Sequence, residues 1–203
     1  IPEQKLIPFG IPVSQKFCGK TPKVQARELL GLPAESPVFL VMTGGEGCGK
    51  TEDICKGLVQ AAGTDARIIV LIGRNEPLKS KLRQLFGNTG QVQAVSFTED
   101  VQLYMDACDI LLTKPGGLSS TEAAVKNVPF VHTRPIPGCE TKNAQFFSEQ
   151  GLSWVAQSSL DAAHKAVSLY RDFEACTQML LLQRKVINPH AAEDICSYLL
   201  DSR

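Results

Sequence analysis

The alternation of short apolar runs with helical stretches is the feature of this sequence that most restricts the fold. Several runs show little polar alternation, which is typical of strands covered on both faces. These runs are 37–43, 66–73, 92–97, 109–113, 129–133 and 153–156. Helices are predicted at about 52–62, 76–86, 99–107, 118–127, 141–150 and 159–171, and in "HAAEDICSYLL" near the end. The pattern predicts an α/β fold with a Rossmann-like, doubly wound parallel sheet.

The first 36 residues differ from the rest, because they hold five prolines and no strong periodicity. We expect 1–36 to be a lead-in or linker and 37–203 to be one domain. The chain opens on Ile1 rather than Met, so we expect it to be part of a longer protein.

Charge and cysteine usage exclude several classes of function. Lys+Arg and Asp+Glu are both 21, and this balance argues against a nucleic-acid partner. The seven cysteines show no C-x-x-C spacing, which indicates reduced thiols in a cytosolic compartment. No apolar run is long enough to span a bilayer, so a membrane role would be peripheral.

The first glycine-rich loop, "TGGEGCGKT", matches the phosphate loop G-x-x-x-x-G-K-[ST] from Gly44 to Thr51. An NTPase also needs a carboxylate at the end of a neighbouring strand to hold magnesium. None of the predicted strands ends in Asp or Glu. The glycines, among them Gly44, Gly45 and Gly47, still suit a backbone that approaches a phosphate. A merely tight strand-to-helix turn is the alternative.

The second loop, "KPGGLSSTE", follows the run 109–113. Ser119 and Glu122 have the spacing of a capping box, which is a purely structural explanation of both. The functional interpretation is a helix N-terminus that binds a diphosphate, with Glu122 accepting hydrogen bonds from a ribose diol. The "KPGG" ahead of the helix and the second glycine loop upstream favour the functional interpretation.

Several motifs in order resemble a known family. "TKPGGLSSTEAA", "IPGCETKNAQF", "GGEGCGK" and "FGIPV" are similar to the C-terminal domain of the monogalactosyldiacylglycerol synthases and processive diacylglycerol glucosyltransferases. These are relatives of the peptidoglycan enzyme that adds N-acetylglucosamine to lipid I. The resemblance covers essentially the whole chain, and it implies the C-terminal half of a GT-B glycosyltransferase. By resemblance, Lys50 and Thr51 are incidental and the NTPase interpretation is disfavoured.

The resemblance also implies roles for individual residues. Glu122 is expected to hold the ribose, the backbone near Phe97 to meet the uracil, and the glycine loops to contact the diphosphate. The implied diphosphate loop is Gly116, Gly117, Leu118, Ser119 and Ser120. The implied sugar contacts are Gly138, Cys139, Glu140 and Asn143, with an N-terminal cap and a surface Asn as the alternative. Cys139 stands where the family usually has Gln, which leaves the donor sugar open.

These expectations define a UDP-sugar-binding domain of an inverting, metal-independent transferase with a lipid acceptor. The acceptor and the catalytic base are expected on a separate N-terminal domain, and no cofactor or metal is expected here. His132, His164 and His190 are isolated in sequence, and we expect them to be structural or exposed. Three alternatives stay open: a UDP-N-acetylglucosamine 2-epimerase-like enzyme, an NTPase, and a partner-binding scaffold with an inactive nucleotide site.

Overall fold

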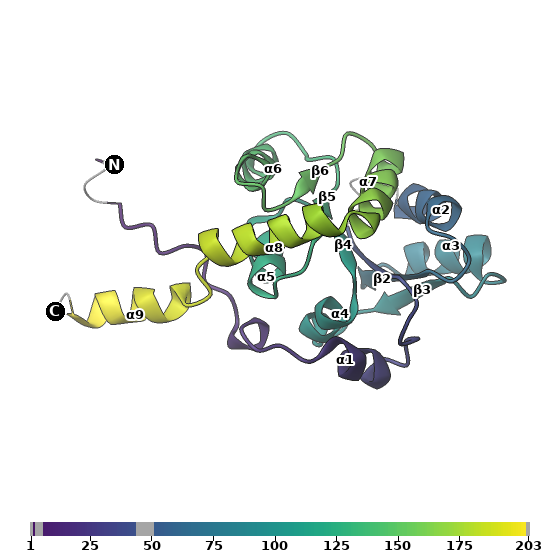
Figure 1. The fold of residues 1–203 in the computed structure, drawn as a ribbon, viewed down its shortest axis with the longest axis horizontal. Helices are drawn as coiled ribbons and strands as arrows, with labels where there is room; N and C mark the ends of the chain where they lie inside the picture. Colours follow the sequence, from purple (N-terminus) through teal and green to yellow (C-terminus); the bar gives the residue numbers. More distant parts are fainter. Residues whose placement is uncertain (1, 3–5, 44–50, 202–203) are drawn as a thin grey trace.

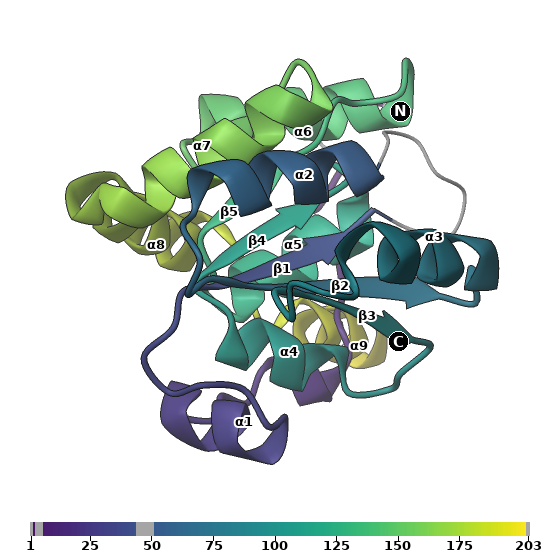
Figure 2. The same ribbon diagram turned by 90° about the vertical axis from the view of Figure 1, so that its right-hand side faces the viewer.

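The computed structural model describes residue 2 and residues 6–43 and 51–201, and it shows a parallel sheet between two layers of helices (Figures 1 and 2). The six strands lie in the order β3-β2-β1-β4-β5-β6, and each pairs in parallel with its neighbours. Their bounds are β1 Val38–Met42, β2 Arg67–Gly73, β3 Val92–Ser96, β4 Ile110–Thr113, β5 Phe130–His132 and β6 Trp154–Val155. This order is that of the Rossmann fold, so the predicted fold class is confirmed.

The helices follow the strands as the sequence predicts, with two additions. Predicted and observed are α2 Thr51–Ala61, α3 Glu76–Phe86, α4 Val101–Ala107, α5 Gly117–Val125, α6 Cys139–Glu149, α7 Ser159–Arg171 and α9 Ala191–Asp201. The sequence prediction did not include α1, Lys23–Leu29, or α8, Phe173–Val186. A short 3-10 helix, η2, spans Gln15–Phe17.

The core has one cluster of apolar side chains on each face of the sheet. Alternate residues of β1 point to opposite faces, so Phe39 and Val41 pack with α2, α3 and α7, whereas Val38 and Leu40 pack with α4 and α5. Figure 2 shows α2, α3 and α7 on one side of the sheet and α4 on the other. Burial on both faces explains why β1, β4 and β5 lack polar alternation.

The segment before β1 packs on the domain instead of running free as a linker. Helix α1 contacts α4, and the buried Arg27 donates from Nε to the Ala107 carbonyl oxygen at 3.0 Å. Its guanidinium also pairs with Asp109 at 2.7 Å. These polar contacts hold α1 against the body, while its role between two domains stays a prediction.

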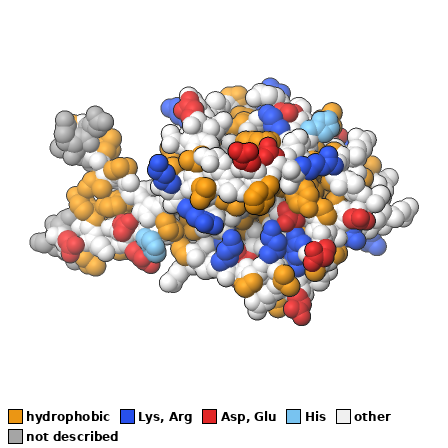
Figure 3. All heavy atoms as spheres, in the orientation of Figure 1, with side chains coloured by type: hydrophobic (Ala, Val, Ile, Leu, Met, Phe, Trp, Pro, Cys, Tyr) orange, Lys and Arg blue, Asp and Glu red, His pale blue; other side chains and the backbone are white. Residues whose placement is uncertain are grey.

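Helix α9 and the N-terminal segment lie beside each other and extend away from the rest of the chain (Figure 1). The rings of Phe9 and Tyr198 are 5.5 Å apart, and Asn188 Nδ2 donates to the Phe9 carbonyl oxygen at 3.0 Å. Leu199 and Leu200 are exposed, and apolar side chains are visible on this extension in Figure 3. On the face shown there, basic and acidic side chains are interspersed over the body.

Candidate nucleotide-sugar site

The candidate site lies where the strand order reverses. β1 and β4 are neighbours, with Met42 opposite Thr113, and the chain leaves them toward opposite faces of the sheet. Ligands of open α/β sheets bind in the crevice outside the carboxyl ends of such strands. Both glycine-rich loops follow these two strands. Gly44, Gly45 and Gly47 lie outside the described residues, as does Lys50.

The residues that flank the first glycine loop are held together in the core. Thr43 follows β1 and Thr51 begins α2, and their hydroxyl oxygens are 2.6 Å apart. Both residues are buried. The Thr51 hydroxyl therefore serves a core hydrogen bond. None of the described strands ends in a carboxylate residue, so the magnesium ligand of an NTPase is missing there too.

The start of α5 does not form the capping box. Gly116 is the N-cap residue with φ −76° and ψ 136°, and no side chain caps the helix. Ser119 is the third residue of the helix, so it stands beyond the N-cap position that the capping box requires. The first-turn N–H groups that lack intrahelical partners consequently carry the positive end of the helix dipole toward this edge of the sheet.

Glu122 lies one turn further along α5 and is half-buried. Its carboxylate makes no hydrogen bond or ion pair with any residue in the described ranges. Burial raises the pKa of the Glu122 carboxyl, and the positive charge of Lys16 lowers it in part. A carboxylate with free lone pairs, next to an uncapped helix start, can accept two hydroxyl donors of a sugar ring.

A hollow of about 220 Å³ lies next to α5, at the carboxyl ends of β1, β2 and β3. Ser119 and Phe97 both line it, so two residues predicted to contact the nucleotide come together. Met42, Leu71 and Val101 supply apolar walls. The ring of Phe97 is exposed, and the Arg74 guanidinium carbon lies 5.4 Å from its centre. A flat base could stack in such an apolar hollow.

Within the predicted diphosphate loop, the side chain of Ser120 faces the core. It is fully buried, and its hydroxyl lies 2.8 Å from His132 Nε2. Its backbone N–H donates to the Gly116 carbonyl oxygen at 3.0 Å. The prediction of direct diphosphate contact therefore does not fit Ser120, because α5 begins at Gly117 and turns this position toward the core.

The predicted sugar loop begins α6 and touches the α5 loop. Gly138 is the N-cap residue at φ +117°, a conformation that favours glycine, and α6 begins at Cys139. The Glu140 carboxylate accepts a hydrogen bond from the Ile136 N–H at 2.9 Å, so part of its hydrogen-bonding capacity stabilises its own loop. Asn143 is half-buried, and its Nδ2 donates to the Pro115 carbonyl oxygen at 3.0 Å. Its amide thus joins the two loops, unlike a free surface Asn.

The N-terminal segment supplies neighbours of the site that the sequence prediction missed. A Cβ on Gly117 would lie 3.2 Å from Ile11 Cδ1 and 3.7 Å from Asn143 Nδ2. Lys16 lies close enough to Glu122 to affect its pKa. No local pattern signals these contacts, since they arise only when residues 11–16 fold back over α5.

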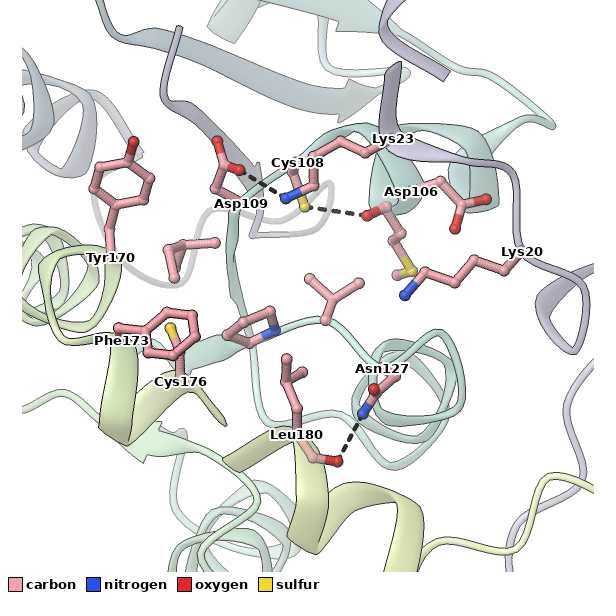
Figure 4. A pocket seen from close by; sticks show the side chains of 14 residues that line it. Lys20, Lys23, Asp106, Cys108, Asp109, Asn127, Tyr170, Phe173, Cys176 and Leu180 are labelled. Carbon is pink, nitrogen blue, oxygen red and sulfur yellow. Dashed lines mark hydrogen bonds and ion pairs between the residues drawn. The ribbon is translucent and has the colours of Figure 1, made fainter. Parts of the chain in front are cut away.

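A second hollow, of about 380 Å³, lies at the opposite edge of the sheet (Figure 4). Lys20, Asp109, Asn127 and Phe173 are among the side chains that line it. Its charges are largely paired: the Lys23 ammonium, for example, lies 2.7 Å from Asp109. It contains none of the predicted site residues, and a ligand would have to compete with these pairs.

Within the described ranges, no group of three or more His, Cys, Asp or Glu residues has the geometry of a metal site. His164 and His190 are exposed. None of the described helices combines the length and hydropathy needed to cross a bilayer.

The sequence model of the glycosyltransferase family 28 C-terminal domain matches residues 43–169. The chain belongs to this family. The resemblance inferred from the motifs is thereby confirmed, and the matched range of the family 28 domain includes both glycine loops and α6.

Curated relatives of the family 28 domain act on diacylglycerol, according to their names. The processive diacylglycerol β-glucosyltransferase of Bacillus pumilus is 28% identical over 194 residues, covering 95% of this chain and 50% of the relative. The enzyme of the same name from Staphylococcus aureus strain MRSA252 is also 28% identical, over 95% of this chain and 49% of its own. The chain thus spans about half the length of the curated relatives it matches.

Solved structures show the same fold. MurG of Acinetobacter baumannii superposes with a TM-score of 0.65 at 18% identity, over 91% of this chain and 55% of its own. Anabaena Alr3699/HepE, in complex with UDP-glucose, superposes with a TM-score of 0.70 at 18% identity, over 93% of this chain and 56% of its own.

Proposed function

We propose that this chain is the UDP-sugar-binding domain of an inverting, metal-independent glycosyltransferase that transfers a hexose to a membrane lipid such as diacylglycerol. The observation that carries the proposal is that α5, at the strand-order reversal, combines an uncapped N-terminus with a Glu122 carboxylate that has no partner among the described residues. The bound ligands of the HepE structures and the names of the curated relatives support it.

Each part of a UDP-sugar has a counterpart in this arrangement. The uracil would lie in the hollow beside Phe97, the ribose hydroxyls on Glu122, and the diphosphate at Gly116, Gly117 and the following N–H groups. The sugar would reach the start of α6, where Cys139 is exposed and Asn143 joins the two loops.

The proposed chemistry depends on the negative charge that develops on the leaving diphosphate. Glycosyl transfer proceeds through an oxocarbenium-like transition state. Fixed N–H dipoles at the start of α5 would stabilise the departing charge without reorganising, which is the role that a metal plays in other transferases. The base that deprotonates the acceptor hydroxyl would come from an N-terminal domain of the full-length enzyme, which would be cytosolic and peripheral at a membrane. The chain by itself would bind UDP and catalyse no measurable transfer.

Calorimetry of the purified chain with UDP and 2′-deoxy-UDP tests the proposal. We expect UDP to bind more tightly, because only its ribose presents both hydroxyls to Glu122. Hydrogen bonds to a charged group contribute about 1.5–3 kcal/mol, so Glu122→Ala should weaken UDP binding roughly 10- to 100-fold. The difference between the two nucleotides should largely disappear in this variant. Glu174→Ala, at an exposed position of α8, is the matched control and should change neither affinity.

Three outcomes would contradict the proposal. Tight magnesium-dependent binding of ATP, lost in Lys50→Ala, would indicate an NTPase. No binding of UDP by the wild type would favour a scaffold. For the full-length enzyme, an epimerised sugar nucleotide without a glycolipid product would indicate an epimerase instead of a transferase.

A further inference from the structure

His132 lies in the core between the two helices that carry the candidate ligand loops. It is the last residue of β5 and is fully buried. Its Nε2 lies 2.8 Å from the Ser120 hydroxyl oxygen on α5, and its Nδ1 lies 3.0 Å from that of Ser153, just before β6. Both ring nitrogens are therefore used, and one ring connects two elements that are remote in sequence.

The same ring also contacts α6. The ring centres of His132 and Phe147, which is on α6, are 5.5 Å apart with an interplanar angle of 83°. Phe130, two residues earlier on β5, makes a similar edge contact at 5.1 Å. These contacts fix the plane of the imidazole, so its two hydrogen bonds have defined directions.

The imidazole is neutral in this environment. Burial lowers the pKa of His132 to about 3, so the ring carries one N–H donor and one bare acceptor nitrogen near neutral pH. The Ser120 and Ser153 hydroxyls can each donate or accept, and the two take opposite roles toward the ring. This network is complete without a charge.

Ser120 is well placed to set the orientation of the start of α5. It is the fourth residue of the helix, and its N–H makes the first helical hydrogen bond, to Gly116. A second bond, between its side chain and His132, holds this first turn of the helix in place. The backbone N–H groups of Gly117 and its neighbours in that turn depend on this contact for their direction.

We propose that His132 is a positioning residue of the nucleotide-sugar site: through Ser120, it fixes the first turn of α5 and the N–H groups that receive the diphosphate. This inference rests on the proposed function. Substitutions of this core histidine should therefore weaken binding of the diphosphate and have little effect on binding of the nucleoside.

The two hydrogen bonds of the ring can be separated by substitution. A Gln side chain is long enough to place its amide near the position of Nε2, whereas Asn places its amide near Nδ1. His132→Gln thus keeps a partner for Ser120, and His132→Asn keeps one for Ser153. Ser120→Ala deletes a single oxygen atom, so the test does not depend on the histidine variants being folded. Ser153→Ala is the matched control, because it removes an equivalent buried hydrogen bond from the same ring.

Calorimetry with UDP and with uridine, alongside thermal unfolding, distinguishes positioning from general stability. Since a buried hydrogen bond contributes about 0.5–1.5 kcal/mol, Ser120→Ala and His132→Asn should weaken UDP binding roughly three- to tenfold. Uridine affinity should change less than about twofold, because the nucleoside does not use those N–H groups. His132→Gln should retain most of the UDP affinity, and Ser153→Ala should lower the melting temperature as Ser120→Ala does without weakening UDP binding.

Equal weakening of UDP and uridine in Ser120→Ala, or an equal effect of Ser153→Ala on UDP, would overturn the inference. Unchanged UDP affinity in Ser120→Ala would also overturn it and leave the proposed function standing. Failure of the wild type to bind UDP would overturn both.

Discussion

The ion pair between Lys126 and Asp106 gives a sharp prediction about stability. The Lys126 ammonium lies 2.6 Å from Asp106 Oδ2, and both side chains are only 1% exposed. The same carboxylate oxygen accepts from the Thr21 N–H at 3.0 Å, and Lys126 also donates to the Gly19 carbonyl oxygen at 2.5 Å. The pair therefore joins α4, the end of α5 and the N-terminal segment.

Replacing Lys126 by Met should cost much more than the pair itself contributes. The substitution keeps the apolar part of the side chain but leaves the buried Asp106 charge without its cation. Breaking a buried pair in this way costs about 3–5 kcal/mol. For a protein of this size the melting temperature should fall by roughly 6–20 °C. Urea denaturation and a thermal scan measure both quantities.

Lys23→Met is the matched control. Lys23 makes an ion pair with Asp109 at 2.7 Å, but its side chain is 49% exposed. Asp109 also keeps its contact with Arg27. We expect Lys23→Met to change the free energy of unfolding by no more than about 1 kcal/mol. If Lys126→Met is no more destabilising than this control, the buried-charge reasoning is refuted. The double variant Asp106→Leu/Lys126→Met should be more stable than Lys126→Met, because it removes both charges.

Three further predictions concern the site and the core. UDP affinity should fall as pH falls through the raised pKa of Glu122, because the protonated carboxyl accepts fewer hydrogen bonds. Calorimetry across pH 4–7 measures this loss. It should occur at higher pH in Lys16→Met, since the positive charge that lowers the pKa of Glu122 is gone. Cys139→Gln should tighten UDP-sugar binding more than UDP binding, because an amide can both donate to and accept from sugar hydroxyls; equal affinities for both ligands before and after the change would argue against sugar contact at this position. Gly57→Ala should lower the free energy of unfolding by about 1–3 kcal/mol in urea titrations, because its Cβ would lie 2.7 Å from that of Ala163 on α7; a neutral result would mean that α2 and α7 can separate at low cost.

The strands and most helices could be predicted from the sequence because the central strands, such as β1 and β4, are buried on both faces and carry their own apolar signal. Helix α1 could not, since it is held by the polar contacts of Arg27 and not by an apolar stripe. Helix α8 follows α7 after a single residue, Asp172, which breaks the pattern less than a glycine or proline would.

The loops of the candidate site could be proposed from the sequence, whereas the directions of their side chains could not. The spacing of the glycines and of Glu122 in the sequence indicates a binding loop. Ser120 stands among the same hydroxyl residues, yet only the helical phase reveals that it faces His132. Asn143 likewise contacts Pro115 across 28 residues, a link that no local pattern contains.

The helix starts at the strand-order reversal determine which kind of ligand a chain with zero net charge can attract. Helix α2 begins after β1 and α5 after β4, so two positive dipole ends converge on one edge while the total charge stays at zero. Such a field acts within the reach of one helical turn and fades beyond it. Such a field attracts a small dianion that enters the crevice, but it does not steer nucleic acids from a distance. Moderate salt should therefore leave the rate of ligand capture almost unchanged.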